Sequence, residues 1–361
     1  MTVPVSIPRY PDDVTADWLA GVLATDGTEI SQVEVTAVGT GQTGATYRVA
    51  VDYAANPVAL PQTFVIKLPA TDDTVRDRVV FGYRSECAFY GSVADRVQVP
   101  IPQCYHCDIS EDAASYALLL SDQAPATQGD QIAGCGETQA RLAATAIAGL
   151  HGPTWCQQEW LTFPGLAMST VSDEAKKGLG DVAVMSADIT VEKLGAKLSA
   201  ADRQTFVEAM SLVTPWLQND FGRYSLIHGD YRLDNMLFHP DGTQIWVVDW
   251  QTLGVGLPTR DLSYFAATSL EPDVRARVER DLVVDYHGAL LRHGVTGYEL
   301  ESCWDDYRYG VIQALLISAL GFAFAVGTDR GDDMIATMLR RGCQAIRDLD
   351  TVVLVRATAG I

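Results

Sequence analysis

Basic residues are scarce in this sequence of 361 residues, which holds 26 lysines and arginines against 46 aspartates and glutamates. The formal net charge of −20 repels the phosphates of nucleic acids and anionic lipids, so we expect neither nucleic acid nor a membrane as a partner. A small cationic molecule or a metal-nucleotide complex is compatible with this charge. Plain solubility would also account for it.

Other features are missing too. The seven cysteines are odd in number and scattered, unlike the framework of a small disulfide-rich domain, so we expect reduced thiols. The first residues, MTVPVSIPRYPDD, lack the basic and apolar regions of a signal peptide. The apolar run at 311–326, interrupted only by Gln313 and Ser318, is shorter than the ~20 residues of a bilayer span and favours a buried helix. We therefore expect a cytoplasmic protein.

The spacing of apolar residues changes along the chain and divides it into two parts. Short β-rich stretches at residues 30–53, 58–68, 97–105 and 116–120 predict an antiparallel sheet, joined by one long helix over about 75–93. These elements predict a small N-terminal lobe over residues 1–121.

The pattern then becomes helical. One helix is predicted at 137–151, with His151 expected to cap its C-terminal end, and another from a capping box at Ser199 to Trp216 or Leu217. Two apolar runs around residues 240–242 predict a hairpin.

We therefore place a hinge at residues 122–128 and a larger, mainly helical lobe at residues 129–361.

The most informative stretch, residues 225–265, contains HGDYRLDNMLF. In it Asn235 follows Asp230 by five positions, and Asp249 ends the next apolar strand. Phosphoryl transfer uses such a set, because one aspartate orients the acceptor hydroxyl and takes its proton while an asparagine and a second aspartate hold the metal ions on the phosphates. Mg²⁺ prefers such oxygen ligands. The alternative is a polar loop beside a core strand.

With this motif the sequence resembles the aminoglycoside phosphotransferase and choline kinase-like superfamily, closest to its ecdysteroid kinase-like and acyl-CoA-dehydrogenase-associated branches. The resemblance implies a protein-kinase-like α+β fold with two lobes: an antiparallel-sheet N-lobe with one long helix, and a larger helical C-lobe. It implies Asp230 as the catalytic base, with Asn235 and Asp249 as magnesium ligands.

The same resemblance assigns supporting roles. His228 and Asp261 would support the catalytic loop, and Leu237 would lie under the adenine ring. Arg232, inside the loop, would meet phosphate or an anionic substrate, or else form a structural salt bridge.

Upstream, Lys67 ends a predicted strand and resembles the lysine that reaches the α- and β-phosphates in kinases. Glu86, in the long helix, is the one glutamate between Leu68 and Ser110. We expect the two to pair, which would hold the lysine at the nucleotide. The alternatives are an exposed strand lysine and a solvated helix carboxylate.

The glycines Gly39, Gly41 and Gly44 satisfy G-x-G-x-x-G, a weak pattern by itself. A dinucleotide fold would need a helix after them, yet residues 46–51 read as a strand. Ala45 stands where a Walker A loop would have lysine. A strand, a glycine turn and a strand instead predict a loop that covers phosphates in kinase-like enzymes, or a plain hairpin.

The segment from Tyr116 to Asp122 resembles the inter-lobe hinge of the family, so Leu120 and Asp122 are expected beside the adenine. A protein kinase would have Arg in place of Gly229, Phe-Gly in place of Trp250-Gln251, and a later Ala-Pro-Glu. These departures favour a constitutive small-molecule kinase.

We therefore expect an ATP- and Mg²⁺-dependent phosphotransferase that moves the γ-phosphoryl group to an alcohol by direct in-line transfer. The acceptor stays open among an aminoglycoside or other amino sugar, a sterol-like alcohol and a hydroxyacyl thioester. Asp305 and Asp306 would bind a cationic acceptor or merely begin a solvated helix. The alternative function is a catalytically weak pseudokinase that acts as a nucleotide-binding module.

Overall fold

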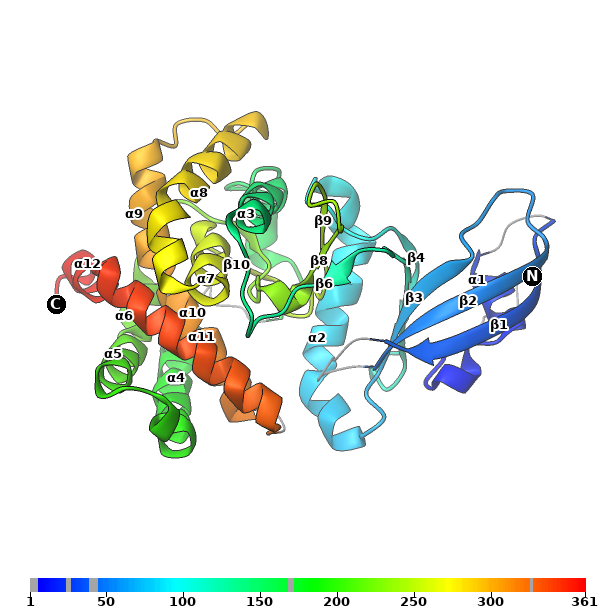
Figure 1. The fold of residues 1–361 in the computed structure, drawn as a ribbon, viewed down its shortest axis with the longest axis horizontal. Helices are drawn as coiled ribbons and strands as arrows, with labels where there is room; N and C mark the ends of the chain where they lie inside the picture. The colour runs from blue at the N-terminus through cyan, green and yellow to red at the C-terminus, as the bar shows by residue number, and fades with distance from the viewer. Residues whose placement is uncertain (1–5, 24–26, 39–44, 168–171, 325–326) are drawn as a thin grey trace. The chain divides into compact units, whose positions relative to one another are not determined.

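The computed structural model describes residues 6–23, 27–38, 45–167, 172–324 and 327–361. The chain forms two compact units (Figure 1). The first comprises residues 1–95, 101–125 and 249–251, and the second comprises residues 96–100, 126–248 and 252–361. Residues 249–251 thus belong to the first unit although their neighbours in sequence belong to the second.

The first unit is a five-stranded antiparallel sheet with strand order β1-β2-β3-β5-β4, together with one long helix and one short helix. Its elements are η1 (Pro11–Asp13), α1 (Ala16–Leu23), β1 (Glu29–Ala37), β2 (Ala45–Ala55), β3 (Thr63–Leu68), α2 (Asp73–Ser92), β4 (Cys104–Ile109) and β5 (Tyr116–Ser121), and η2 (Ala94–Arg96) lies where the chain passes to the second unit.

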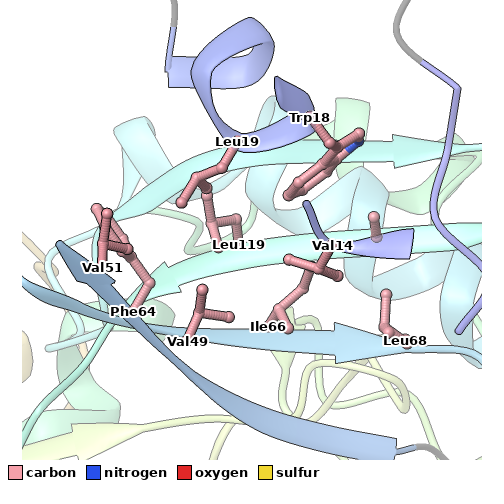
Figure 2. Packing of buried hydrophobic residues seen from close by; sticks show 10 residues of the cluster. Val14, Trp18, Leu19, Val49, Val51, Phe64, Ile66, Leu68 and Leu119 are labelled. Carbon is pink, nitrogen blue, oxygen red and sulfur yellow. The ribbon is translucent and has the colours of Figure 1, made fainter. Parts of the chain in front are cut away.

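One face of this sheet carries the core shown in Figure 2. Because side chains alternate along a strand, β3 buries Phe64, Ile66 and Leu68 on this face. Trp18 of α1 covers them from the other side of the core. Lys67 lies between Ile66 and Leu68 in β3, so its side chain is on the opposite face of the sheet.

The predicted strand at 97–105 is partly wrong, because β4 begins only at Cys104. Pro100 and Pro102 lack the N–H that a sheet ladder requires, which explains why residues 97–103 stay outside the sheet. The long helix is present as α2, and Asp72 caps it by accepting hydrogen bonds from the backbone N–H groups of Thr74 and Val75.

The second unit consists of helices and two small antiparallel sheets, β10-β7 and β6-β8-β9. Its elements are β6 (Thr127–Gln128), α3 (Glu137–His151), η3 (Gln158–Thr162), α4 (Asp173–Leu194), η4 (Gly195–Lys197), α5 (Ala200–Ser211), α6 (Val213–Gln218), β7 (Ser225–Ile227), η5 (Leu233–Asn235), β8 (Met236–Phe238), β9 (Ile245–Val247), β10 (Gly254–Gly256), α7 (Thr259–Ser269), α8 (Pro272–Arg292), α9 (Leu300–Gly310), α10 (Ile312–Phe324), α11 (Asp329–Asp348) and α12 (Thr351–Ala359).

Helix α7 is the centre of this unit. All eleven of its residues are buried, and it packs against α9, α10 and α11. The predicted hairpin is present, with β8 paired to β9. The helix predicted from Ser199 to Trp216 or Leu217 is wrong in its extent, because α5 ends at Ser211 and α6 begins at Val213. Pro215 has no N–H for the carbonyl of Ser211, which breaks the helical ladder there.

Residues 300–324 form one helical run of 25 residues that is long and apolar enough to cross a membrane. Within it, 61% of the most apolar window is buried inside the fold. One such helix is weak evidence of a span, because a buried core helix passes the same test.

Candidate active site

The first unit brings Lys67 and Glu86 into direct contact. Lys67 lies on β3, and Glu86 lies on the buried face of α2. Lys67 Nζ is 2.7 Å from Glu86 Oε1, and the glutamate side chain is 1% exposed. The structure thus joins the two residues that the sequence predicts as a pair.

Both oxygens of Glu86 are held. Tyr116 OH donates to Oε2 at 2.7 Å, and the backbone N–H of Trp250 donates to Oε1 at 3.3 Å. Burial alone would lower the pKa of Lys67, but Asp249 and Glu86 raise this pKa above its ordinary value. Lys67 therefore stays protonated beside a fixed carboxylate.

Asp249 is the third member of this cluster. Its Oδ1 lies 3.7 Å from Lys67 Nζ, and its side chain is 32% exposed. Its φ of 70° is a left-handed conformation that residues other than glycine seldom adopt. Trp250 anchors the segment, because its ring stacks on Phe89 of α2 with centroids 3.7 Å apart. Strained backbone held in place by its surroundings is typical of functional positions.

The segment predicted as the hinge lies in and just after β5. Leu120 is buried in the strand between β3 and β4. The Asp122 carboxylate accepts hydrogen bonds from Arg48 of β2, at 2.7 Å from Nε and 3.3 Å from Nη2, and from the N–H of Ala124. Because both oxygens of Asp122 are engaged, contacts to adenine here would fall to backbone groups.

The glycines predicted to cover the phosphates, Gly39, Gly41 and Gly44, lie outside the described residues. The strands on either side of them, β1 and β2, are antiparallel neighbours, with Ala37 opposite Tyr47.

In the second unit, Gly229 shapes the loop that carries Asp230. β7 ends at Ile227, and Gly229 then turns the chain with a φ of +83°. A Cβ at this position would lie 2.4 Å from the carbonyl oxygen of Thr252. Glycine alone satisfies both the left-handed conformation and the close approach, which explains the glycine of the motif.

His228 joins the loop to the end of the hairpin. Its Nδ1 accepts the backbone N–H of Asp230 at 3.3 Å, so the ring proton resides on Nε2, which lies 3.1 Å from the carbonyl oxygen of Val248. The imidazole thereby links two segments that carry predicted site residues.

Asp261 fixes the same loop from α7. It is fully buried and accepts the backbone N–H groups of His228 at 2.6 Å and Gly229 at 3.0 Å. Burial alone would raise the pKa of Asp261, but His151, His228 and the N–H of Gly229 lower this pKa overall. Asp261 is therefore an ionised buried carboxylate whose partners are largely the loop backbone.

The expectation that His151 caps its helix is wrong. The imidazole is buried, with Nε2 3.1 Å from Asp261 Oδ2 and Nδ1 2.8 Å from Tyr286 OH. The last turn of α3 packs into the core, so the ring bridges α7 and α8 and leaves the helix carbonyls to other partners. His151 is thus a second layer of support behind Asp261.

Donors surround the Asp230 carboxylate. Tyr264 OH from α7 lies 2.7 Å from Oδ1, and Asn235 Nδ2 lies 2.9 Å from Oδ2. Arg232 Nε is 3.1 Å from both oxygens. Burial, and then the charge of Asp230, raise the pKa of Tyr264 well above its usual range. The phenol therefore stays protonated and donates a hydrogen bond to Asp230.

Asn235 has a defined amide orientation. Its Nδ2 donates to the backbone oxygen of Asp230 at 2.8 Å as well as to the carboxylate. The opposite end of the amide, Oδ1, is then the atom that a cation would meet. An oxygen from Asn235 and a carboxylate from Asp249 are ligands that fit Mg²⁺ carried on phosphates. Within the described ranges, no group of three or more His, Cys, Asp or Glu side chains could hold a metal ion by itself.

Leu237 lies at the centre of β8, between Gln128 of β6 and Trp246 of β9, and is half-buried.

Asp306 is buried in a pair with Arg223, at 2.8 and 2.7 Å, so its carboxylate is already engaged. Asp305 is exposed and lies 3.3 Å from Arg308.

Sequence reasoning missed three residues that support the loop. Tyr264 holds Asp230 directly, Gln313 Nε2 donates to the carbonyl of Gly229 at 3.0 Å, and Gln131 Oε1 accepts the N–H of Leu233 at 2.9 Å. Gln313 had a sequence signal, because it interrupts an otherwise apolar run. A buried amide in such a run needs a hydrogen-bond partner.

With this geometry defined, comparison with known proteins identifies the family. The sequence profile of the ecdysteroid kinase-like family matches residues 39–295, a range that includes the predicted nucleotide-binding, catalytic and metal-binding residues. The chain belongs to the ecdysteroid kinase-like family. The resemblance drawn from the HGDYRLDNMLF motif is thereby confirmed.

Curated relatives of this ecdysteroid kinase-like chain include acyl-CoA dehydrogenase family member 11 of Gallus gallus, 39% identical over 69 residues, or 18% of this chain and 9% of that protein. Acyl-CoA dehydrogenase family member 10 of Mus musculus is 37% identical over 62 residues, or 16% of this chain and 6% of that protein. The matches thus span less than a tenth of these relatives' length.

Solved structures show the fold. The ethanolamine kinase of Plasmodium vivax has a TM-score of 0.51 and 12% identity, covering 85% of this chain and 81% of its own. A GDP complex of aminoglycoside 2'-phosphotransferase-IIIa has a TM-score of 0.50 and 14% identity, covering 86% and 92%. The predicted kinase-like α+β fold is confirmed, and family and fold together indicate a small-molecule phosphotransferase.

Proposed function

We propose that this ecdysteroid kinase-like protein transfers the γ-phosphoryl group of ATP to a hydroxyl group of a small molecule. The carrying observation is the cluster in which Lys67 Nζ lies 2.7 Å from Glu86 and 3.7 Å from Asp249. A lysine kept protonated next to a partly exposed aspartate is suited to meet phosphate together with a metal ion. The proposal requires that this cluster and Asp230 act on one nucleotide.

Each residue then has a chemical task. Lys67 neutralises charge on the α- and β-phosphates, and Glu86 keeps the lysine in place. Asn235 and Asp249 would hold Mg²⁺, which supplies charge neutralisation on the phosphates when bound. Asp230 orients the acceptor hydroxyl and receives its proton as the oxygen bonds to the γ-phosphorus and the bond to the leaving ADP oxygen breaks.

The acceptor is proposed within three classes: an aminoglycoside or other amino sugar, a sterol-like alcohol, and a hydroxyacyl thioester. The aminoglycoside 2'-phosphotransferase-IIIa structure is a complex with GDP, so GTP is tested beside ATP as the donor.

The test is a screen of nucleotide consumption over these three classes, with Asp230→Ala as the blank. We expect one class to be phosphorylated by the wild type, and Asp230→Ala to lose about 10²–10⁴-fold of the rate because the acceptor is no longer oriented. A thermal shift with Mg²⁺ and ATP should persist in the variant.

Asp241→Ala is the matched control, because this aspartate lies in the exposed β8–β9 turn and is half exposed. Wild-type turnover by Asp230→Ala would contradict the proposal. Binding of Mg²⁺ and ATP by the wild type without transfer to any acceptor would favour the pseudokinase function instead.

A further inference from the structure

Among the residues that the structure describes, three side chains donate to the Asp230 carboxylate. Two carboxylate oxygens offer about four lone-pair positions. Tyr264 and Arg232 face Oδ1, and Asn235 and Arg232 face Oδ2. A hydroxyl that donates to Asp230 must therefore displace one of these three side chains.

The three donors are unequal. Tyr264 is fully buried and makes one bond of 2.7 Å, and Asn235 is anchored twice, at 2.9 Å to the carboxylate and at 2.8 Å to the backbone oxygen. Arg232 uses one Nε–H for both oxygens, at 3.1 Å each. Arg232 shares a single hydrogen between two acceptors at the longest distance, so its hydrogen bonds to Asp230 have the poorest geometry of the three, and the opposite charges of the two side chains supply the rest of the attraction.

Arg232 also lies on the accessible side of Asp230. The side chains of Arg232 and Asp230 are 19% and 21% exposed, whereas Tyr264 is 0% exposed. An incoming molecule thus meets Arg232 and cannot reach Asp230 through Tyr264.

A second carboxylate keeps Arg232 in the loop. Arg232 Nη1 lies 2.7 Å from Asp234 Oδ2, and the other oxygen of Asp234 accepts the N–H of Gln131 at 3.1 Å. Nη1 also contacts Met334 Sδ on α11 at 3.4 Å. The guanidinium can therefore release Asp230 at Nε while Asp234 retains it at Nη1.

We propose that Arg232 occupies the place of the acceptor hydroxyl in the free protein and that the acceptor displaces its Nε–H from Asp230. This inference rests on the proposed phosphotransferase function. Arg232 is then a positioning residue that keeps water away from Asp230 until an acceptor arrives.

The test uses ATP with water as the acceptor, so no substrate needs to be known. Arg232→Met keeps an unbranched side chain but has no guanidinium and no donor, and it should raise the hydrolysis of Mg²⁺-bound ATP by about 3- to 10-fold because water then reaches Asp230. Loss of a purely structural salt bridge would not raise this rate. Arg232→Lys, which keeps a charged donor, should give a rate between those of the wild type and Arg232→Met.

Arg347→Met is the matched control, because Arg347 also pairs with an aspartate, Asp202, and lies outside the loop. A fall in hydrolysis in Arg232→Met would show that Arg232 contacts phosphate, and an unchanged rate would show a structural salt bridge; either result overturns the inference. If the wild type neither binds nor consumes nucleotide, the proposed function fails and the inference fails with it. If the wild type phosphorylates an alcohol while Arg232→Met hydrolyses ATP no faster, only the inference fails.

Discussion

The two units hold their predicted site residues with opposite arrangements of charge. In the first unit one cation, Lys67, lies against two carboxylates, Glu86 and Asp249. In the second unit one carboxylate, Asp230, lies among donors from Arg232, Asn235 and Tyr264. Each unit therefore surrounds its central group with side chains of complementary charge or polarity.

The units also differ in what fixes the central group. In the first unit, Lys67 of β3 is held by Glu86 of the long helix α2, and Tyr116 of β5 holds Glu86 in turn. The loop that carries Asp230 lies outside the helices and strands. Its shape depends on the buried Asp261 and on the conformation of Gly229. We therefore expect the second unit to be the more sensitive to single substitutions.

Asp261→Asn should have the largest effect. It removes the buried negative charge that accepts two loop N–H groups and contacts His151, and breaking such a buried interaction costs about 3–5 kcal/mol. Hydrogen exchange should accelerate at residues 225–227, while residues 63–68 of the first unit keep their protection. Unchanged exchange at 225–227 would contradict the role of Asp261, and Asp241→Asn in the exposed turn serves as the control.

Gly229→Ala should lower the free energy of unfolding of the second unit by about 3 kcal/mol. The added Cβ would clash with the Thr252 carbonyl oxygen, and alanine would also have to adopt an unfavourable positive φ. Gly222 is the matched control, because its φ of +64° is similar but no atom lies within 4 Å of an added Cβ. Gly222→Ala should cost only about 1 kcal/mol. Urea unfolding of the two variants measures the difference, and equal costs would show that φ alone matters.

Glu86→Gln should cost about 2 kcal/mol in the first unit, because Lys67 loses a charged partner and the amide keeps only one of the two oxygens to which Tyr116 and Trp250 donate. The same change should weaken binding of Mg²⁺ and ATP in a calorimetric titration. Glu111→Gln, at an exposed position, is the control. If Glu86→Gln instead disturbed exchange at 225–227 more than Asp261→Asn does, the comparison between the units would be reversed.

Acid should produce the smallest and most gradual effect. The lowered pKa of Asp261 contributes stability that is fully present above the unfolded value near ~3.9 and is lost as pH falls through the folded pKa. Over that interval the stability difference between the wild type and Asp261→Asn should shrink by up to about 1.4 kcal/mol per pH unit. Urea titrations between about pH 6 and pH 2 measure this, and a difference independent of pH would contradict a charged Asp261.

Much of the fold followed from local patterns. Alternation in β3 and the Asp72 cap of α2 depend on neighbouring residues, so the sheet and the long helix were predictable. The limits of β4 and α5 were not, because prolines at 100, 102 and 215 act through missing N–H groups rather than through hydrophobicity.

The candidate site shows the same division. Lys67 and Glu86 were paired correctly, since Glu86 is the one glutamate between Leu68 and Ser110 and lies in the helix that follows the strand of Lys67. His151 was misassigned, because position at a helix end does not reveal that the end is buried against α7 and α8. Tyr264 had no sequence signal, since its contact with Asp230 spans 34 residues.

The sequence by itself determined the family and the residue types of the site, because phosphoryl transfer needs particular groups at particular spacings in the motif from His228 to Asn235 and at Asp249. Only the tertiary structure decided which side chains support those groups. It also decided that the Asp230 carboxylate already accepts hydrogen bonds from side chains of the protein itself. Hydrogen bonds form between atoms that folding brings within about 3 Å, and distance along the chain does not predict such proximity. Arg232 and Asp230 are only two residues apart in the sequence. Tyr264, which also donates to the Asp230 carboxylate, lies 34 residues away, and only folding brings it there.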